Sequence, residues 1–536
     1  MTNTDGELSL RPRRTMPVPL GSIVRDFGLA LSEGADRDTP LTGATLDSRD
    51  VRPGDLYLAL PGARRHGADF AAGAAGLGAA AILTDEAGAE RARATGLPVA
   101  IAPEDPRRIA GRVAAAVYGT ERPGALVFGV TGTNGKTSVV YLLAALLEAA
   151  GLKTGISSTA ERRVGETALI SSLTSPEAPE LHALLALMRE EEVGGIALEV
   201  SAHAVARHRI DGVRFDVVAF NNFSQDHLDD FGDMESYFAA KLALFAPEHA
   251  ERGVVVVDSA EGRRIARDSR IPVTTLSTEY GAEADWHLAV TAQDLDGVSF
   301  ALQGPEGARF RGRVPVLGRF MAENAALALI MLHEAGIGLD RVAAGLDRGL
   351  IPVYIPGRLE LIRAAPAASP VGPEAGDDAA HGGGSVAGPR FYVDYGHTPG
   401  AFQAMVDALA EVAEGRVIFL FGADGDRDTT KRFEMGRIAG AGSDAVIVCD
   451  YHPRTEDPAA IRAELIAGAR AAGRAEVHEE ADPRRAVRLA ISLAGPDDVI
   501  LYAGPGHEDY QEVAGHQLPY SARDEVRGAL REAGML

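Results

Sequence analysis

The chain has 536 residues, too many for one hydrophobic core, and predicts three domains at about 150 to 200 residues each. Hydrophobic residues make up 46% and charged residues 24%, which is typical of folded globular proteins and not of disordered or fibrous ones. The net charge of -23 opposes broad binding to nucleic-acid phosphates, although a few local basic groups can still hold a small phosphorylated ligand. We therefore expect no nucleic-acid partner.

The cysteine content and the hydropathy pattern bear on the compartment. Cys449 is the single cysteine, so it has no partner for an intramolecular disulfide or a thiolate metal site. No apolar run approaches the roughly 20 residues needed to cross a bilayer, and residues 1–14 lack the apolar segment of a signal peptide. We expect a cytoplasmic monomer that acts on small molecules and has no membrane partner.

The first part of the sequence predicts a small α/β domain over residues 1–122. Short apolar segments between Gly43 and Asp85 are typical of strands, and Arg52-Pro-Gly-Asp55 is typical of a turn. The alanine- and glycine-rich stretch 70–81 favours a tightly packed helix.

A second domain begins where an apolar strand runs into a glycine-rich turn and then a helix. The strand covers 125–130 and the helix 138–150, an order typical of phosphate-binding α/β proteins. Further strand-like segments alternate with helical stretches, as in a parallel sheet covered on both faces. These segments cover 195–200, 215–220 and 253–258. We expect a doubly wound domain over residues 123–357.

The same alternation starts again after residue 357 and predicts a third, Rossmann-like α/β domain over residues 358–536. Its apolar strands each end in a polar or glycine-rich loop. They cover 391–394, 417–421, 445–449 and 499–503. The stretch 364–389 is rich in Ala, Gly, Pro and Ser and cannot bury enough apolar surface to offset the entropy lost on ordering, so we expect a mobile surface insert.

The most informative motif is Gly-Val-Thr-Gly-Thr-Asn-Gly-Lys-Thr-Ser, from Gly129 to Ser138. Between a strand and a helix, its backbone N–H groups and the helix N-terminus attract phosphate, and Lys136 and Thr137 should meet phosphate and magnesium. Five residues rather than four separate Gly129 from Gly135, so the loop is a subtype of the common phosphate loop. A purely structural glycine turn is the alternative, which the Gly-Lys-Thr sequence disfavours.

Two further polar sites follow predicted strands. Glu199 ends the apolar run 195–200, which places its carboxylate at the carboxyl edge of the sheet, where α/β proteins bind ligands. Asp226 and His227 follow the next strand and its loop, and they can complete a magnesium shell or orient phosphate. Taken alone, a surface glutamate or a helix-capping aspartate is the commoner explanation for either site.

Together these motifs resemble the Mur ligase family, and within it the MurE-type UDP-N-acetylmuramoyl-tripeptide synthetases, over nearly the whole sequence. The first two domains carry the resemblance in Leu46-Asp-Ser-Arg49 with Pro53-Gly-Asp55, Thr133-Asn-Gly-Lys-Thr137, Thr174-Ser-Pro-Glu177, Glu199-Val-Ser-Ala-His203, Arg209, 222–229 and Lys241. The third domain carries it in Asp394-Tyr-Gly-His-Thr-Pro399, Gly425-Asp-Arg-Asp428 with Lys431, Pro453-Arg454 and 504–508. The resemblance implies an N-terminal UDP-sugar-binding domain, a central ATP-binding domain and a C-terminal domain that binds an amino acid.

The resemblance also implies roles for single residues at a site for ATP and Mg²⁺. The residues implied in catalysis are Lys136, Glu199, His227 and Lys241, the last as a carbamate. The residues implied as metal ligands are Thr137, Glu199 and His227. The residues implied in nucleotide binding are Gly132, Thr133, Asn134, Gly135, Lys136, Thr137, Ser138, Asn324, Arg358 and Asp394, which implies that the two domains close during turnover.

A last set of residues is implied in binding the substrates. The muramoyl-peptide side comprises Leu46, Ser48, Thr174, Ser175, Ser201, Arg207 and Arg209. The amino-acid side comprises Arg427, His452, Pro453, Arg454, Gly504 and Glu508. The implied reaction transfers the γ-phosphoryl group of ATP to a carboxylate and lets an amine attack the acyl phosphate, while domain closure excludes water.

Several positions depart from the family pattern. Where MurE-type enzymes that use meso-diaminopimelate carry Asp-Asn-Pro-Arg, this sequence reads Tyr451-His-Pro-Arg454. Arg454 can still pair with a distal carboxylate, which favours a diaminopimelate-like amino acid, but two larger rings change the hydrogen-bonding groups of the pocket. The other departures are Ala202, Arg207, Asp424 and Pro505.

These departures leave three functions open. The first is a divergent cell-wall ligase that adds an amino acid to UDP-MurNAc-L-Ala-D-Glu, and the second is a paralogue recruited to ligate an amino acid to another carboxylate. The third is a nucleotide-binding protein that has lost catalysis, which the intact loop and Lys241 disfavour. A folylpolyglutamate synthetase shares the chemistry but lacks the signature at Leu46 to Arg49.

Overall fold

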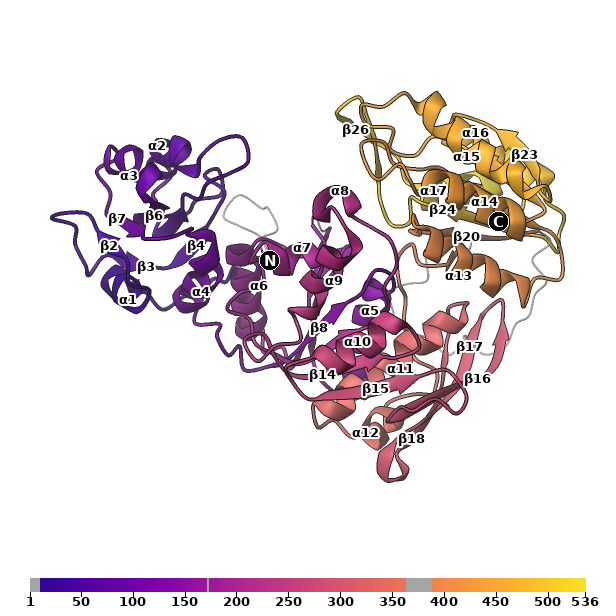
Figure 1. The fold of residues 1–536 in the computed structure, drawn as a ribbon, viewed down its shortest axis with the longest axis horizontal. Coiled ribbons are helices and arrows are strands. Elements are labelled where there is room, and N and C mark those ends of the chain that lie inside the picture. Colours follow the sequence, from indigo (N-terminus) through magenta and orange to yellow (C-terminus); the bar gives the residue numbers. More distant parts are fainter. Residues whose placement is uncertain (1–9, 171–172, 363–387) are drawn as a thin grey trace.

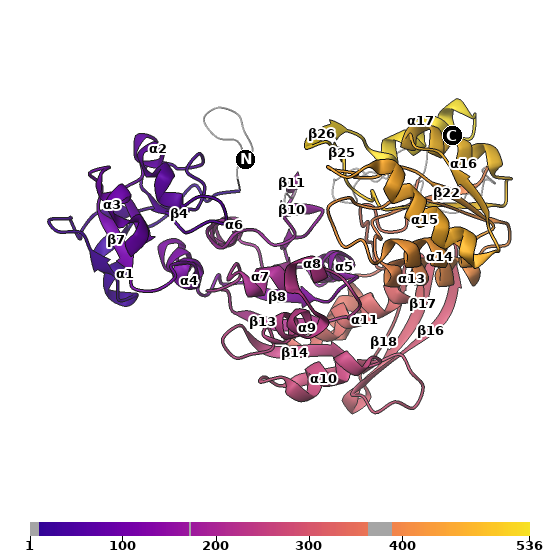
Figure 2. The ribbon, with the colours of Figure 1, turned by 45° about the horizontal axis from the view of Figure 1, so that its top comes forward.

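The computed structural model describes residues 10–170, 173–362 and 388–536. Three α/β units follow one another along the chain, and the N-terminal and C-terminal units lie on opposite sides of the central one (Figures 1 and 2). No helix within these ranges combines the length and apolar character needed to span a membrane. The three-domain α/β architecture predicted from the sequence is confirmed, whereas the predicted insert 364–389 lies almost wholly outside the described residues.

The N-terminal unit is built on a five-stranded sheet in the order β2-β7-β6-β5-β4, parallel except where β2 joins β7. Its elements are β1 (Val18–Pro19), α1 (Leu20–Asp26), β2 (Ala30–Leu31), β3 (Pro40–Leu41), β4 (Gly43–Thr45), β5 (Asp55–Leu58), η1 (Gly67–Phe70), α2 (Ala71–Gly76), β6 (Ala81–Asp85), α3 (Glu86–Arg93), β7 (Val99–Ala102) and α4 (Arg107–Tyr118). Helix α2 is shorter than the helix predicted over 70–81, because Gly78, at φ +100°, turns the chain toward β6.

The central unit is built on an eleven-stranded sheet in the order β11-β10-β9-β12-β8-β13-β14-β15-β16-β17-β18, in which the run from β9 to β16 is parallel. Its strands are β8 (Leu126–Thr131), β9 (Thr154–Ser157), β10 (Glu161–Val164), β11 (Thr167–Ile170), β12 (Gly195–Glu199), β13 (Phe215–Phe220), β14 (Ala250–Val256), β15 (Val273–Ser277), β16 (Trp286–Asp294), β17 (Gly297–Gln303) and β18 (Arg309–Val314). Its helices are α5 (Lys136–Ala149), α6 (Ala178–Glu190), α7 (Ala202–Ala206), α8 (Leu228–Phe231), α9 (Met234–Leu242), α10 (Ala260–Asp268), η2 (Pro305–Gly307), α11 (Arg319–Glu334) and α12 (Leu339–Ala344).

Alternate residues of the central strands point into two different cores. Phe128 and Ala197 pack with α5 and α11 on one face of the sheet, whereas Val127 and Ile196 pack with α6, α9 and α10 on the other. Because successive strand side chains point to opposite faces, strands buried on both faces read as continuous apolar runs. The predicted doubly wound sheet is confirmed.

The C-terminal unit is built on a six-stranded sheet in the order β19-β20-β24-β21-β22-β23, parallel except where β19 joins β20. Its strands are β19 (Glu360–Leu361), β20 (Arg390–Asp394), β21 (Val417–Phe421), β22 (Ala445–Val448), β23 (Glu476–Glu479) and β24 (Val499–Ala503), with a separate hairpin of β25 (Tyr510–Val513) and β26 (His516–Pro519). Its helices are α13 (Pro399–Ala410), α14 (Arg432–Gly442), α15 (Pro458–Ala472), α16 (Pro483–Leu493) and α17 (Ala522–Glu532). Helices α13 to α15 cover one face and α16 and α17 the other.

Candidate active site

The phosphate loop links β8 to α5 and has the strand-to-helix geometry predicted for it. Gly135, at φ +85°, is the N-cap of α5, and a Cβ there would lie 2.3 Å from Nδ2 of Asn221, so only glycine fits. The Lys136 ammonium folds over the loop and donates to the carbonyl oxygens of Gly132 (3.0 Å) and Thr133 (2.9 Å). Burial lowers the pKa of Lys136, although the carboxylate of Glu199 opposes this shift.

Two asparagines after β13 hold the loop from the side. The backbone N–H of Asn134 donates to Oδ1 of Asn222 at 2.9 Å, and the backbone N–H of Thr133 donates to the main-chain carbonyl of Asn222 at 3.0 Å. Nδ2 of Asn221 donates to Oδ1 of Asn324, a predicted nucleotide contact on α11, at 2.7 Å. Sequence reasoning did not single out Asn221, because the residue reveals its role only through partners about a hundred positions away.

Glu199 lies beside the loop because β12 pairs with β8, with Glu199 opposite Val130. Its carboxylate is 2% exposed and accepts two hydrogen bonds from Thr159, from the amide at 2.8 Å and from the hydroxyl at 3.0 Å. Thr159 was not predicted. Its hydroxyl oxygen also lies within hydrogen-bond distance, 3.1 Å, of Oγ1 of Thr174, a predicted substrate contact. A buried carboxylate oriented in this way is a suitable ligand for a hard divalent cation.

Lys241 on α9 is 1% exposed and reaches the same loop from below the surface. Its Nζ donates to the carbonyl of Gly132 at 2.8 Å and lies 4.4 Å from the centre of the Tyr237 ring. Among the described residues no carboxylate forms an ion pair with this ammonium group. Burial, with Lys136 nearby, lowers the pKa of Lys241 well below its usual value and so favours the neutral amine.

Asp226 and His227 follow β13 at the same edge of the sheet. His227 adopts φ +54° immediately before α8. Burial lowers its pKa to about 4, so the imidazole is neutral and able to bind a metal ion. Burial alone would raise the pKa of Asp226, but His227, His397 and Lys431 outweigh it and lower the pKa. Lys431 of the C-terminal unit lies 3.9 Å from this carboxylate.

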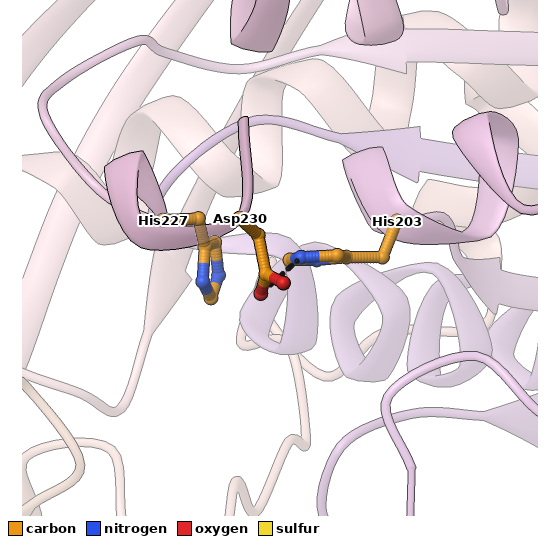
Figure 3. A group of neighbouring side chains, drawn as sticks. All are labelled: His203, His227 and Asp230. Atoms are coloured by element: carbon orange, nitrogen blue, oxygen red, sulfur yellow. Dashed lines mark hydrogen bonds and ion pairs between the residues drawn. The ribbon is translucent and has the colours of Figure 1, made fainter. Parts of the chain in front are cut away.

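His227 also belongs to a group of three possible metal ligands, shown in Figure 3. Its partners are His203 on α7 and Asp230 on α8, and the ligand atoms of the three lie within 4.8 Å of one another. Nε2 of His203 lies 2.9 Å from Oδ2 of Asp230, and Arg207 lies 3.3 Å from the other oxygen. The predicted substrate residue Arg207 is therefore placed next to the predicted metal ligand His227.

A connected group around Glu199 includes Ser175, Ser201 and Arg209, which are also implied in muramoyl-peptide binding. Ser175 donates to the carbonyl of Glu199 at 2.8 Å and accepts from the amide of Ser201 at 3.2 Å. Arg209 lies 2.9 Å from the carboxylate of Glu177. In the N-terminal unit, Leu46 and Ser48 follow the carboxyl end of β4, in a different unit from these residues.

The C-terminal unit contributes to the phosphate loop directly. Nη2 of Arg358 donates to Oγ1 of Thr137 at 2.9 Å, and its guanidinium lies 4.6 Å from the centre of the Tyr395 ring. Asp394 accepts from the amide of Leu359 at 2.7 Å and is 8% exposed; burial raises its pKa although Arg358 opposes this. The predicted nucleotide residues of the two units thus meet at one place.

The residues implied in amino-acid binding gather around Glu508. Its carboxylate is contacted by the Tyr451 hydroxyl, by Nε2 of His452 at 2.8 Å and by the Tyr395 hydroxyl at 3.3 Å. Tyr451 and His452 are both buried, and the ring of Tyr451 also packs next to Gly504, which adopts φ +117°.

Arg454 follows with φ +50° and lies between two carboxylates. Its Nη2 donates to Oδ1 of Asp424 at 3.2 Å, and its Nε lies 3.3 Å from Oε2 of Glu512 on the β25–β26 hairpin, within ion-pair distance but outside hydrogen-bond geometry. Arg427, by contrast, is exposed. We call the six residues around this point the distal cluster; they are Asp424, Tyr451, His452, Arg454, Glu508 and Glu512.

The phosphate loop lies between a strand and a helix and is contacted by the C-terminal Rossmann-like unit. This arrangement is typical of ATP-dependent enzymes of the phosphate-loop class. Family models match all three units: the Mur ligase family, catalytic domain over residues 40–118, the Mur ligase middle domain over 130–332, and the Mur ligase, glutamate ligase domain over 383–506. The chain belongs to the Mur ligase family.

Curated relatives extend the match over the full length. A UDP-N-acetylmuramyl-tripeptide synthetase of Leifsonia xyli subsp. xyli is 54% identical over 98% of this chain and 99% of its own. A UDP-N-acetylmuramoyl-L-alanyl-D-glutamate--2,6-diaminopimelate ligase of Streptomyces coelicolor is 40% identical over 97% of this chain and 98% of its own. The second name specifies the amino acid that is added, and the first does not.

Solved structures show the same architecture. A structure titled as a UDP-N-acetylmuramoyl-L-alanyl-D-glutamate--2,6-diaminopimelate ligase is 27% identical, with a TM-score of 0.63 over 97% of this chain and 100% of the other. A Mycobacterium tuberculosis folylpolyglutamate synthase complexed with ADP shares the fold at 20% identity, with a TM-score of 0.57 over 75% of this chain and 92% of the other.

Proposed function

We propose that this chain is an ATP-dependent, ADP-forming ligase that adds an amino acid to UDP-MurNAc-L-Ala-D-Glu in the synthesis of peptidoglycan precursors. The observation that carries the proposal is the full-length relation to a tripeptide synthetase at 54% identity. The described geometry supports it, because Glu199, Lys241 and Arg358 all lie beside the phosphate-loop segment from Gly132 to Thr137. The monomeric state expected from the sequence stays a prediction.

The first step transfers the γ-phosphoryl group of ATP to the substrate carboxylate and releases ADP. Lys136 and the loop N–H groups offset the charge of the phosphates, and Arg358 adds a cation from the opposite unit. Thr137, Glu199 and His227 offer hydroxyl, carboxylate and imidazole ligands that would hold Mg²⁺, which would supply further charge neutralisation on the phosphates. The carboxylate of Glu199 is buried and is oriented by two hydrogen bonds, so it is better suited to bind a cation than to be hydrated.

Lys241 is suited to become a carbamate. The addition of CO₂ to an amine requires the neutral form: the nitrogen lone pair bonds to carbon, one proton leaves, and a carboxylate results. Burial lowers the pKa of the Lys241 amine and so favours its neutral form, and a buried ammonium without an anionic partner would be costly. A carbamate would instead present an anion to the cations at the loop. Labelled bicarbonate should give a carbamate carbon signal by NMR in the native enzyme and none in Lys241→Arg.

The second step forms the amide. The α-amino group of the incoming amino acid loses its proton, attacks the carbonyl carbon of the acyl phosphate and expels inorganic phosphate. The C-terminal unit would hold this amino acid, since it contacts the phosphate loop through Arg358 and Thr398. Packing of that unit against the loop also keeps water from the acyl phosphate.

The test is phosphate release from ATP by the purified protein with Mg²⁺ and UDP-MurNAc-L-Ala-D-Glu, with amino acids added one at a time and product masses recorded. One amino acid should give turnover and the mass of the matching tripeptide product. Absence of product with every amino acid, in protein that still binds ATP, would contradict the proposal. Turnover with a different carboxylate would then identify a recruited ligase, and its absence a nucleotide-binding protein.

A further inference from the structure

The distal cluster has an unusual balance of charge, and His452 is the residue that fixes it. The amide of Glu512 donates to Nδ1 of His452 at 2.7 Å, so this ring nitrogen carries a lone pair and no proton. The proton of the neutral ring therefore sits on Nε2, which donates to Glu508 at 2.8 Å. His452 orients the Glu508 carboxylate without neutralising it.

Arg454 is the only cation among the six residues of the distal cluster, and it already faces two anions. Asp424 accepts from Nη2 at 3.2 Å, and Glu512 lies 3.3 Å from Nε. The Arg454 side chain is 17% exposed, so these pairs are weakly screened by solvent. A third carboxylate brought to this arginine would meet two like charges within a few ångströms.

The formal charges follow directly. Asp424, Glu508 and Glu512 contribute three negative charges and Arg454 one positive charge, which leaves the cluster at about −2 with His452 neutral. The negative charge of the cluster also affects the pKa values of the neighbouring tyrosines.

Burial raises the pKa values of Tyr395, Tyr451 and Tyr510, and the charge of Glu508 raises them further. Oε2 of Glu508 accepts from both Tyr451 and His452, whereas Oε1 accepts only from Tyr395 among the described residues. Because a carboxylate oxygen can accept two hydrogen bonds, Oε1 retains a free acceptor position. The cluster therefore has an oriented anion ready for a cation.

We propose that the distal cluster selects an amino acid whose side chain ends in an ammonium group and carries no distal carboxylate, with Asp424, Tyr451 and His452 as the specificity-determining residues. The inference rests on the proposed ligase function. Glu508 receives the side-chain ammonium, and Asp424 and Glu512 keep Arg454 from serving a carboxylate. Juxtaposing like charges in a partly buried site is unfavourable enough to exclude a diacid.

L-Lysine and meso-diaminopimelate are the matched pair for the test, because they share a carbon skeleton and differ by the distal carboxylate. The full-length protein, ATP, Mg²⁺ and UDP-MurNAc-L-Ala-D-Glu are used with each, and with the shorter homologues ornithine and 2,4-diaminobutyrate. We expect kcat/KM for the best monocarboxylate to exceed that for diaminopimelate by about 100-fold or more. A preference for diaminopimelate would overturn the inference and leave the ligase function standing.

Variants separate the charge argument from general damage to the pocket. Asp424→Asn frees Arg454 and should raise the use of diaminopimelate relative to the monocarboxylate by about 10-fold. Glu476→Gln, an exposed change of the same charge on the sheet-edge strand β23, is the control and should leave the ratio unchanged. An unchanged ratio in folded Asp424→Asn would contradict the assignment of Asp424.

Tyr451→Phe keeps the ring and removes only the hydrogen bond to Glu508. It should raise KM for the cationic amino acid about 5- to 10-fold with no change in KM for ATP. A merely structural role for the tyrosine would move both constants together, which would count against the inference. No product with any amino acid, in protein that still binds ATP, would instead remove the proposed function on which the inference depends.

Discussion

The central unit makes two junctions, and they are built differently. At the junction with the N-terminal unit, α4 packs closely on the central unit: a Cβ on Gly111 would lie 2.1 Å from the carbonyl oxygen of Asp211. Ala183 and Ala186 of α6 belong to the hydrophobic core of the N-terminal unit. His182, also on α6, is fully buried and bridges two partners, Thr120 at 2.8 Å and the Asp211 carbonyl at 3.0 Å.

The junction with the C-terminal unit also contains apolar packing, near Leu295 and Tyr392, but several of its polar contacts are made by residues of the predicted reaction site. Arg358 reaches Thr137, and Thr398 reaches Asn134 at 3.4 Å. Gln225 bridges to Asp428 at 3.2 Å, in the same region where Lys431 approaches Asp226.

The difference indicates that the two junctions have different roles. A joint of close backbone approach and buried, fully paired polar groups favours one fixed arrangement. A junction in which several hydrogen bonds use groups predicted to bind phosphate should exchange those partners when nucleotide enters, so we expect its geometry to depend on the ligand. Changes at the first joint should therefore act on stability, and changes at the second on turnover.

The largest effect should come from Lys136→Ala, in the loop on which the second joint closes. Loss of the ammonium that offsets phosphate charge should lower kcat/KM at least about 1000-fold. Thermal unfolding followed by circular dichroism should give an unchanged midpoint, because Lys136 bonds only to carbonyls of its own loop. Near-normal ligation would refute the active-site assignment.

Arg358→Ala tests the second joint itself and should lower kcat/KM about 100-fold with little change in the unfolding midpoint. Arg319→Ala is the matched control, since Arg319 also crosses this joint but pairs with Glu411 at the surface, where its side chain is 64% exposed. The control should change kcat/KM less than about 2-fold. Equal losses of kcat/KM in the two variants would contradict a special role for Arg358 among the residues of this junction.

Gly111→Ala tests the first joint. The added methyl group would collide with the Asp211 carbonyl, and neither backbone can move freely, so unfolding should become easier by about 3 kcal/mol. Denaturant titration would measure the loss, and activity per folded molecule at low temperature should be near normal. Gly528→Ala, at an open position on α17, is the control and should not destabilise.

The smallest effect concerns pH. Burial lowers the pKa of His182 to about 4, so below pH 6.5 the unfolded chain takes up a proton that the folded chain refuses. The stability that His182 contributes is present above pH 6.5 and declines as the pH falls toward 4, by about 1 kcal/mol between pH 7.5 and 5.5. This part of the pH dependence should vanish in His182→Gln and persist in His516→Gln, which changes an exposed residue.

The buried parallel strands could be predicted from the sequence almost residue by residue. Segments 215–220, 417–421 and 499–503 match β13, β21 and β24, because a strand covered on both faces is a continuous apolar run. The antiparallel strands β16 to β18 and the hairpin β25–β26 were not predicted. Their partly exposed faces interrupt the apolar run, so no continuous apolar segment marks them.

Some residues of the candidate site could likewise be predicted from the sequence, and others could not. Lys136 and Glu199 could be placed because each follows a strand whose end is visible in the sequence. Thr159, which holds Glu199, and Asp424, which holds Arg454, could not, because their roles exist only as contacts between loops far apart in the chain. Assignments of single residues to nucleotide, metal or substrate stay predictions until the kinetic tests are made.

The loop that carries Tyr451 and His452 is anchored by its main chain. The Arg454 amide donates to the carbonyl of Glu512 at 3.1 Å, the Ala514 amide donates back to the Arg454 carbonyl at 2.7 Å, and the Gly425 amide donates to the His452 carbonyl at 2.8 Å. None of these bonds depends on side-chain identity. Single substitutions can therefore accumulate at 451 and 452 without redirecting the loop, so that ligases with different building blocks can diverge from one scaffold by point mutation, and can be re-engineered in the same way.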